Sequence, residues 1–369
     1  MARDAERLLK RGLAALLSGF FPLLRDFDPT SFSPKSILVI RQHNQLGDML
    51  CVVPLLRALR SRYPAARLAL MASPVNYEVM EGNRYLDRLI LYDKREILRN
   101  GRFSPSGFVR FIRTFRGGFD MVLTPGTVST SFSSDLFAFL SGARVRVGVA
   151  SLGGEANPSS FFYNVRIPLD WSNEPHRHQT LRNLDLVRAF GVVTEDLSHE
   201  MTLTPEESGI GKGFAAGIGG KGIIGFHPGA GKPPNRWGGE MFARAVEQLS
   251  EATGCRPFIT SGPMDGDVVR DVLNRLKCNV ELIENKSIRE VASIIKEARL
   301  YVTNDTGLLH VAAAVGTPTL ALFGPTDPEQ WAPRGAGIRY IQGEGGVTGS
   351  IPLEKVVAEG VRLFQGALK

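Results

Sequence analysis

The chain of 369 residues contains only three cysteines, Cys51, Cys255 and Cys278. No two of them form a C-x-x-C pair, and their number and spacing exclude a disulfide framework and argue against a metal or redox centre. Cys51 falls within an apolar helical pattern, so we interpret it as a small hydrophobic side chain packed in a core. Cysteine use of this kind is typical of a reducing compartment, and we expect a cytoplasmic protein with no metal ligands.

The sequence also lacks a long apolar run. The stretch from Gly12 to Leu24 is too short and too interrupted to span a bilayer. No motif interleaves aromatic and basic residues as RNA-binding domains do, so nucleic acid is not an expected partner. Neither a short repeat nor a long low-complexity tract is present, which argues against a repeat architecture.

Residues 1–35 form a segment of their own, in which apolar residues recur at helical spacing. One face would carry Leu9, Leu13, Leu16, Phe20 and Leu24, with Arg3, Arg7, Lys10 and Arg11 nearby. Asp4 and Glu6 precede the apolar stretch and no small-residue cleavage site follows it, which argues against a signal peptide. We interpret the segment as an amphipathic helix. It either lies on an anionic membrane surface or docks onto the protein's own body, and the sequence leaves both open.

Length and charge narrow the class of protein. The length exceeds what one ordinary hydrophobic core requires, so two domains are expected. The 40 glycines suit an α/β protein with many tight turns between strands and helices. A net charge of +7 and a pI of about 9.4 favour acidic partners, such as nucleotide phosphates or anionic lipids.

Short apolar runs alternate with helical patterns in both halves of the chain. The runs in the first half are 37–40, 68–71, 89–91, 121–123 and 145–149. Those in the second half are 223–226, 257–260, 280–283, 300–303 and 319–323. This alternation predicts the α/β class, with a parallel sheet in each half.

The same pattern divides the chain into five parts. Residues 36–195, after the N-terminal segment, are predicted to form a first domain. Residues 196–221 are rich in Gly, Glu, Ser and Lys and are predicted to be a linker, either irregular throughout or with a short helix. Residues 222–350 are predicted to form a second domain, and residues 351–369 a C-terminal helix. We expect the functional residues where strands end, because ligands of open parallel sheets bind beyond the carboxyl ends of the strands.

The stretch Asp305-Thr306-Gly307 stands between a buried strand and a helix. Unpaired N–H groups and the helix dipole favour a phosphate at such a point, and Thr306 and Gly307 suit its close approach. Asp305 would repel a bare phosphate. It therefore indicates either a ligand with a sugar between base and phosphate, or a helix cap. Capping by Asp305 or Thr306 and ligand binding are compatible with one another.

The first strand ends in a polar loop, 41–48, that does not match G-x-G-x-x-G, so a dinucleotide site of the usual kind is not expected there. Gly47 allows a tight turn at the start of a helix over about 48–62. Asp48 is then either the cap or a first-turn acid of that helix. Across a cleft from Asp305, it would instead take a proton from an acceptor hydroxyl; the residues alone favour capping.

The loop after strand 223–226 is rich in glycine and basic residues. Gly229, Ala230 and Gly231 would expose N–H groups suited to an anion. Lys232 and Arg236 would neutralise a phosphate. Two basic residues in a glycine-rich loop at a strand end favour phosphate binding over a plain turn.

Two acidic residues, Asp265 and Asp267, follow strand 257–260. Either residue caps the next helix or accepts a hydrogen bond from a ribose hydroxyl, and the residues alone favour capping. Trp237 is interpreted as an anchor for the helix that follows it. The loop Phe323 to Pro333 is either a purely structural turn or places Thr326 and Asp327 at the ligand.

Taken together, these motifs resemble glycosyltransferase family 9, the ADP-heptose:lipopolysaccharide heptosyltransferases. The resemblance runs from about Ile37 to Phe364. It is carried by G-D after the first strand, H-P-G-A with R-W, S-G-P, N-D-T-G-x-x-H-x-A-A, and F-G-P-T-D-P. The D-T-G-x-x-H and F-G-P-T-D-P pair, in this order, is the most specific part.

The resemblance implies a GT-B architecture, in which two Rossmann-like domains with parallel sheets face one another across a cleft. It implies an inverting transfer without a bound metal, with Asp48 as the catalytic base. The implied donor-binding residues are Gly229, Ala230, Asp305, Thr306, Gly307 and His310. The basic residues of the glycine-rich loop, Lys232 and Arg236, are expected to join them. The sequence departs from the family at Asn235, where a lysine is frequent.

The function implied is transfer of a sugar, heptose from ADP-heptose, to a hydroxyl of a lipopolysaccharide-core-type glycolipid. The implied location is cytoplasmic, with peripheral attachment to the inner face of the cytoplasmic membrane. Two alternatives remain at this point. One is a nucleotide-sugar epimerase of GT-B fold, and the other is a non-catalytic protein that binds sugar nucleotides or glycolipids.

Overall fold

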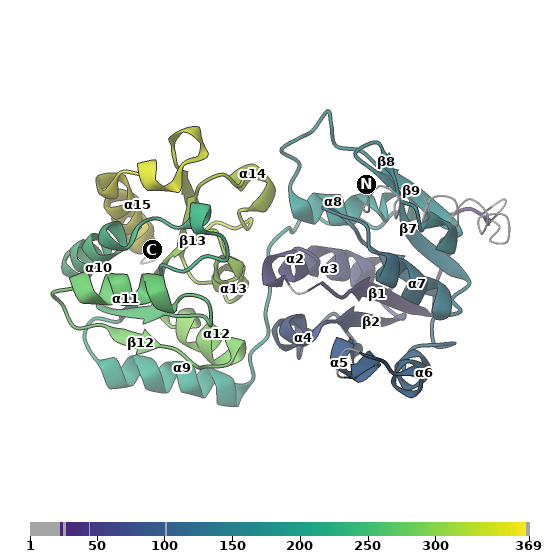
Figure 1. The fold of residues 1–369 in the computed structure, drawn as a ribbon, viewed down its shortest axis with the longest axis horizontal. Helices are drawn as coiled ribbons and strands as arrows, with labels where there is room; N and C mark the ends of the chain where they lie inside the picture. The colour runs from purple at the N-terminus through teal and green to yellow at the C-terminus, as the bar shows by residue number, and fades with distance from the viewer. Residues whose placement is uncertain (1–22, 25–26, 44, 100–101, 367–369) are drawn as a thin grey trace. The chain divides into compact units, whose positions relative to one another are not determined.

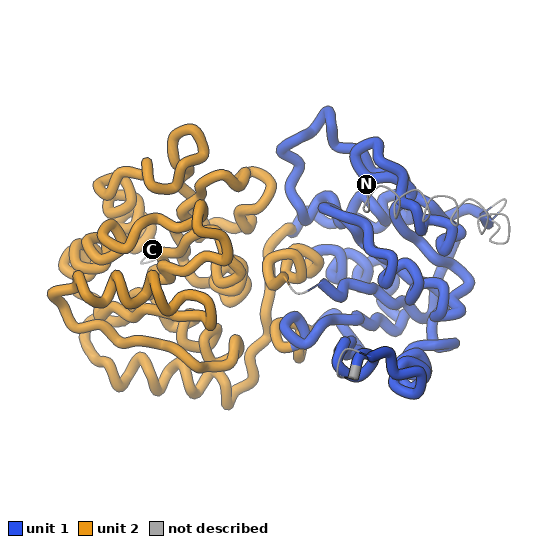
Figure 2. Tube along the Cα trace, in the orientation of Figure 1, with its two compact units in different colours: residues 1–44, 54–77, 84–196 blue, residues 45–53, 78–83, 197–369 orange. Residues whose placement is uncertain are grey.

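The computed structural model describes residues 23–24, 27–43, 45–99 and 102–366. These residues form two compact units (Figure 2). Unit 1 comprises residues 1–44, 54–77 and 84–196, and unit 2 comprises residues 45–53, 78–83 and 197–369. The amphipathic helix predicted near the N-terminus lies outside the described residues.

Unit 1 is built on a seven-stranded sheet with the order β3-β2-β1-β6-β7-β8, in which β9 also pairs with β7. The strands are β1 (Ser36–Arg41), β2 (Arg67–Ala72), β3 (Arg88–Leu91), β6 (Met121–Thr124), β7 (Val145–Leu152), β8 (Glu155–Ala156) and β9 (Val165–Leu169). All pairs are parallel except β7 with β8. The five runs predicted in this half are therefore strands of one sheet.

Short helices connect the strands of unit 1 (Figure 1). They are α3 (Val53–Arg62), α4 (Pro74–Met80), α5 (Lys94–Ile97), α6 (Pro105–Arg113), α7 (Phe132–Leu140) and α8 (Gln179–Asp185), with 3-10 turns η1 (Ser160–Phe162) and η2 (Arg188–Phe190). A small hairpin pairs β4 (Leu98–Arg99) with β5 (Arg102–Phe103). The core on one face is strongly aromatic, because Phe111, Phe115, Phe137 and Tyr163 pack with Leu38 and its neighbours.

Unit 2 contains a six-stranded, fully parallel sheet with the order β12-β11-β10-β13-β14-β15. The strands are β10 (Ile223–His227), β11 (Arg256–Thr260), β12 (Glu281–Ile283), β13 (Ala298–Asn304), β14 (Thr319–Phe323) and β15 (Ile338–Gln342). Strand order reverses between β10 and β13. Ligands of doubly wound sheets bind at such a point, beyond the carboxyl ends of the strands.

Helices cover both faces of this sheet (Figure 1). The helices of unit 2 are α2 (Leu46–Leu50), α9 (Pro205–Ile218), α10 (Gly239–Thr253), α11 (Gly266–Arg275), α12 (Ile288–Lys296), α13 (Gly307–Ala314), α14 (Pro328–Trp331) and α15 (Leu353–Gly366), with 3-10 turns η3 (Pro233–Asn235), η4 (Glu344–Gly346) and η5 (Thr348–Ser350). Ile224 and Phe226 of β10 pack with α10, α11 and α15. Ile223 packs on the other face, with α9, α12 and α13. This double burial explains the continuous apolar runs seen in the sequence.

One predicted helix is divided in the structure, and the segment predicted as a linker contains a helix of 14 residues. The helix predicted over 48–62 is interrupted at Cys51 and Val52, so α2 and α3 are separate and are assigned to different units. The stretch predicted as a linker contains α9, which Thr204 and Glu207 begin with a reciprocal capping box. Helix α9 packs against α12. Across the described part of the chain, none of the helices has the length and apolar character needed to cross a bilayer.

Candidate active site

A cavity of about 560 Å³ lies at the carboxyl ends of the strands of unit 2. Its wall is built from the loops after β10, β11 and β12, from the start of α13, and from α2. The lining residues are Leu46, His227, Ala230, Gly231, Thr260–Gly266, Glu284–Lys286, Ile288, Val291 and Thr306–Leu308. The cavity therefore occupies the position at which a doubly wound sheet binds its ligand.

The start of α13 supplies one wall of the cavity. Thr306 is the N-cap of this helix, and its hydroxyl accepts a hydrogen bond from the backbone N–H of Leu308 at 3.2 Å. Thr306, Gly307 and Leu308 all line the cavity. The positive end of the α13 dipole is thus directed at the cavity, an arrangement that favours an anionic group there.

The glycine-rich loop after β10 is held in place by buried side chains. Asn304 donates hydrogen bonds to the carbonyls of Pro228 at 2.8 Å and Gly229 at 3.2 Å. Its own side-chain oxygen accepts from the backbone N–H of Trp237 at 3.2 Å. A Cβ at Gly229 would overlap the carboxylate of Asp265, so only glycine fits this close approach. The loop presents Ala230 and Gly231 to the cavity.

Trp237 is fully buried and packs edge-on against Phe242 of α10. Its indole N–H donates to the carbonyl of Ile351 at 3.0 Å. This contact fits the interpretation of Trp237 as an anchor for the following helix rather than as a ligand-stacking residue.

Arg236 joins the loop after β10 to the loop after β11. Its guanidinium donates to the carbonyls of Ala230 at 3.2 Å and Met264 at 3.3 Å, and pairs with Asp267 at 3.0 Å. Lys232 is exposed. Within the described residues, Lys232, Arg236 and Asp267 do not contribute to the cavity wall, so the sequence-predicted basic residues border the cavity rather than line it.

Asp265 does line the cavity and is buried. Its Oδ2 accepts a hydrogen bond from the backbone N–H of Gly262 at 2.8 Å and lies 3.8 Å from Nε2 of His227. Burial lowers the pKa of His227, and the nearby Asp265 carboxylate opposes that shift. His227 is not among the predicted site residues. Its position as the last residue of a buried strand is the signal that could have identified it as a cavity residue.

Asp305 is turned away from the cavity toward the loops after β10 and β14. Its carboxylate accepts a hydrogen bond from the side-chain amide of Asn235 at 3.2 Å. The same amide donates to the hydroxyl of Thr326 at 3.3 Å. Asn235, the position at which the sequence departs from the expected lysine, is therefore the direct partner of Asp305. Burial raises the pKa of Asp305, while the Thr326 hydroxyl and the charge of Lys232 oppose that rise.

We expect the variant Asp305→Asn to unfold at a higher temperature than the parent protein near neutral pH. A buried carboxyl with a raised pKa holds its proton more tightly in the folded state, so stability falls as pH rises from the unfolded pKa toward the folded one. Asparagine does not ionise, so it removes this loss of stability. Its side-chain oxygen still accepts the hydrogen bond from the amide of Asn235. Thermal unfolding at about pH 7 and about pH 4 measures the effect, and the gain should disappear near the unfolded pKa of about 3.9. An equal gain at both pH values would contradict this assignment.

Helix α2 packs against α13 inside unit 2. Leu46 lies over Gly307, where an added Cβ would come 3.1 Å from the leucine side chain. At Gly47 an added Cβ would come 2.8 Å from the ring of His310. Asp48 lies in the first turn of α2 and is 6% exposed, whereas the N-cap residue is Gln45. Of the described residues, neither Asp48 nor His310 lines the cavity, and His310 packs under the α2 backbone.

Comparison with known proteins identifies the family of this chain. A family model described as glycosyltransferase family 9 (heptosyltransferase) matches residues 108–345, which is more than half of the chain. The chain belongs to glycosyltransferase family 9. The match covers the cavity loops and Asp305, Thr306, Gly307 and His310, and it begins after Asp48.

Curated relatives of this family 9 protein are heptosyltransferases. Lipooligosaccharide heptosyltransferase 2 of Haemophilus influenzae is 35% identical over 136 residues, an alignment that covers 34% of this chain and only 39% of the relative. Lipopolysaccharide heptosyltransferase 3 of Escherichia coli is 22% identical over 305 residues, covering 78% of this chain and 83% of the relative.

Solved structures support the fold of the family 9 protein. A family 9 glycosyltransferase from Veillonella parvula aligns with a TM-score of 0.78 at 22% identity, over 92% of this chain and 99% of that one. The ADP-heptose lipopolysaccharide heptosyltransferase II of E. coli aligns with a TM-score of 0.74 at 23% identity, over 90% and 100%. Each of the two α/β units is built on a sheet of mainly parallel strands. This is the GT-B architecture, as predicted.

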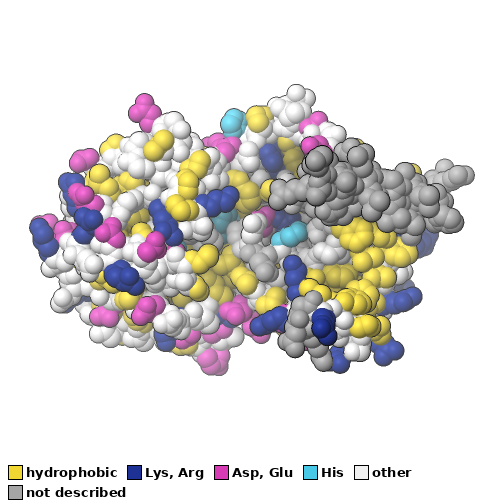
Figure 3. All heavy atoms as spheres, in the orientation of Figure 1, with side chains coloured by type: hydrophobic (Ala, Val, Ile, Leu, Met, Phe, Trp, Pro, Cys, Tyr) yellow, Lys and Arg dark blue, Asp and Glu magenta, His cyan; other side chains and the backbone are white. Residues whose placement is uncertain are grey.

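Unit 1 of the family 9 protein carries an exposed surface that is both apolar and basic. Apolar side chains gather over the region of α5–α7 in the face drawn in Figure 3. We call this surface the apolar–basic corner, and it comprises Leu98, Phe103 and Val109 with Lys94, Arg95, Arg102, Arg110 and Arg113, all exposed. Phe103 is 58% exposed and packs only loosely beside Phe108, with ring centres 5.6 Å apart. Apolar tips beside cationic side chains suit an anionic lipid surface.

Proposed function

We propose that the protein is an inverting glycosyltransferase that moves heptose from ADP-heptose to a hydroxyl of a lipopolysaccharide-core-type glycolipid. The observation that carries the proposal is the packing of α2, which contains Asp48, against the N-terminus of α13 beside the cavity. This packing supports a reaction in which a carboxylate of α2 acts near a phosphate held at the start of α13. The heptosyltransferase relatives support the choice of sugar, and the E. coli ADP-heptose heptosyltransferase II supports the choice of donor.

In this reaction, one side chain serves the acceptor hydroxyl and several groups serve the departing diphosphate. The acceptor O–H passes its proton to Asp48 as the acceptor oxygen bonds to the anomeric carbon, on the face opposite the leaving group. The bond from that carbon to the diphosphate oxygen breaks, and its electron pair leaves with ADP. The start of α13, the hydroxyl of Thr306 and the N–H groups of the glycine-rich loop stabilise the negative charge that develops. Lys232 and Arg236 add positive charge at the border of the cavity.

The ribose of the donor is assigned to the loop after β11. Asp265 lines the cavity, which supports a contact between its carboxylate and a ribose hydroxyl. Asp267, the other candidate from the sequence, is exposed and paired with Arg236. We therefore favour Asp265 over Asp267 for this contact.

A nucleotide screen tests the donor class. ADP and ADP-sugars should raise the midpoint of thermal unfolding, whereas UDP and GDP at the same concentration should not. A ligand at 100 times its Kd adds about 2.7 kcal/mol to the free energy of unfolding, which is readily measured. Equal stabilisation by UDP would reject an ADP-sugar donor. Incubation of donor alone, followed by NMR, separates transfer from epimerisation, because a changed sugar without acceptor would contradict transfer.

We propose that the apolar–basic corner holds the protein on the anionic membrane that contains its glycolipid acceptor, at the cytoplasmic face. The double variant Phe103→Ser, Val109→Ser should bind vesicles rich in phosphatidylglycerol about tenfold more weakly in a sedimentation assay, because two exposed apolar side chains are lost. The variant Val193→Ser removes a similarly exposed side chain elsewhere in unit 1 and serves as the control. Unchanged binding by the double variant would reject this surface.

A further inference from the structure

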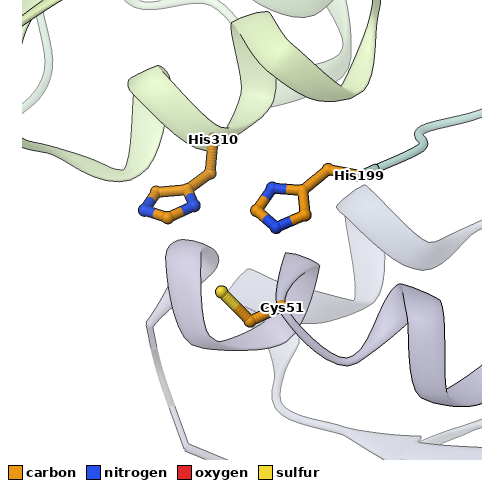
Figure 4. A group of neighbouring side chains, drawn as sticks. All are labelled: Cys51, His199 and His310. Carbon is orange, nitrogen blue, oxygen red and sulfur yellow. The ribbon is translucent and has the colours of Figure 1, made fainter. Parts of the chain in front are cut away.

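Three side chains with metal-binding atoms meet inside unit 2, away from the cavity wall. Cys51 is the C-cap residue of α2, His310 belongs to α13, and His199 lies in the segment before α9 (Figure 4). All three are buried. One ligand atom from each, the sulfur of Cys51 and a ring nitrogen of each histidine, lies within 4.8 Å of the other two.

The backbone around this group is fixed by its own contacts. The segment that carries His199 is tied to the end of α13, because the N–H of Met201 donates to the carbonyl of Ala314 at 3.0 Å. The two imidazole rings are nearly parallel, with centres 5.3 Å apart and an interplanar angle of 18°. In Figure 4 the sulfur of Cys51 is turned toward the rings. The three side chains therefore come from three segments, and their ligand atoms lie within 4.8 Å of one another.

We propose that Cys51, His199 and His310 bind a divalent transition-metal ion, of which Zn²⁺ best fits the ligands. One thiolate and two imidazoles are the donors that Zn²⁺ prefers, and hard ions such as Mg²⁺ prefer oxygen. Zinc bonds of about 2.3 Å to sulfur and about 2.0 Å to nitrogen place tetrahedral ligand atoms about 3.5 Å apart. Because the two rings are stacked, at least one imidazole would have to rotate to bring the ligand atoms, now within 4.8 Å of one another, to that geometry. Binding releases the thiol proton to solvent.

A second cavity gives the ion a route to this group. It has a volume of about 390 Å³ and is lined by Ser198 and His199, by the end of α13 from Ala313 to Thr317, and by residues 334–338. His199 thus contributes to the lining of this cavity and also lies beside the buried cysteine. A water molecule from that space can complete a tetrahedral shell of three protein ligands.

The ion would be structural. Cys51, His199 and His310 do not line the proposed donor cavity within the described residues, so the ion has no contact there with the diphosphate. It would instead join the end of α2, three residues beyond Asp48, to α13, whose start forms the cavity wall. The proposal goes beyond the proposed transfer reaction, and its test does not depend on activity.

Metal analysis of the untagged full-length protein tests the proposal. Purified protein should contain zinc in a one-to-one ratio with the chain by plasma mass spectrometry. Protein stripped with a chelator should take up Co²⁺ with a thiolate-to-cobalt charge-transfer band and the strong visible bands of a four-coordinate ion. A wild-type protein that contains no metal and develops no such band on Co²⁺ titration would overturn the proposal.

Two ligand variants and one control test the assignment. Cys51→Ser should abolish the charge-transfer band, and His199→Gln should weaken Co²⁺ binding by more than about 100-fold. Cys255→Ser removes another buried thiol of unit 2 and should leave the band unchanged. An undiminished band in Cys51→Ser would overturn the assignment. If that variant fails to fold, the His199→Gln and Cys255→Ser pair decides the same question.

Discussion

Replacing Asp48 with asparagine is expected to lower kcat of heptosyl transfer by about 100- to 10,000-fold. The amide has nearly the same size as the carboxylate and cannot accept the acceptor proton. The affinity for ADP should stay at the parent value, because Asp48 does not line the cavity among the described residues. Transfer rates with saturating donor and ADP binding by calorimetry measure the two effects separately.

The control for this experiment is Asp170→Asn, which changes an exposed acid of unit 1 that accepts a hydrogen bond from the N–H of Ser172 in its own turn. It should keep the parent rate. An Asp48→Asn protein that folds, binds ADP and transfers sugar at the parent rate would remove Asp48 from the role of base. Loss of both activity and ADP binding would instead indicate a structural role for Asp48 in placing α2.

The variant Gly47→Ala is expected to lower kcat by about 100-fold, since displacing a catalytic group by about 1 Å is enough for such a loss. The new methyl group would come 2.8 Å from two ring atoms of His310. His310 is buried, so we expect the clash to be relieved by a shift of α2 away from α13 that carries Asp48 with it. Stopped assays at saturating donor measure kcat, and thermal unfolding shows whether the fold survives.

Gly213→Ala is the matched control, because a Cβ at this position of α9 meets nothing within 4 Å. It should leave kcat unchanged and raise the free energy of unfolding by about 0.5–1 kcal/mol, as alanine replaces glycine inside a helix. Unchanged kcat in Gly47→Ala would show that the position of α2 against α13 does not matter to the reaction.

The sequence was a good guide to the central strands and a poor one to the edges of the sheets. Parallel strands buried on both faces read as uninterrupted apolar runs, and all ten predicted runs are strands. Strands β9 and β15 were not predicted. The pattern of β15, Ile-Arg-Tyr-Ile-Gln, is largely exposed because the strand lies at the sheet edge, so its residues do not stand out from a loop.

The positions of the site loops followed from where the strands end, but the directions of their side chains did not. Asp305 and Thr306 are neighbours, yet Thr306 lines the cavity and Asp305 turns to Asn235. His310 lies one helical turn beyond Gly307 and packs under α2. Cys51, His199 and His310 are far apart in the sequence. The packing of α2 on α13 and the backbone bond of Met201 to Ala314 bring them together. No spacing rule could have detected that group.

Residues 45–53 belong to the same compact unit as 197–369, although a whole domain of chain separates them. A truncated polypeptide that begins at Leu197 would lack Leu46 from the cavity wall and the cover that Gly47 gives His310. Such a fragment should be less soluble than the whole protein and should hold nucleotide poorly. To study the nucleotide-binding half by itself, residues 45–53 would have to be joined to this fragment.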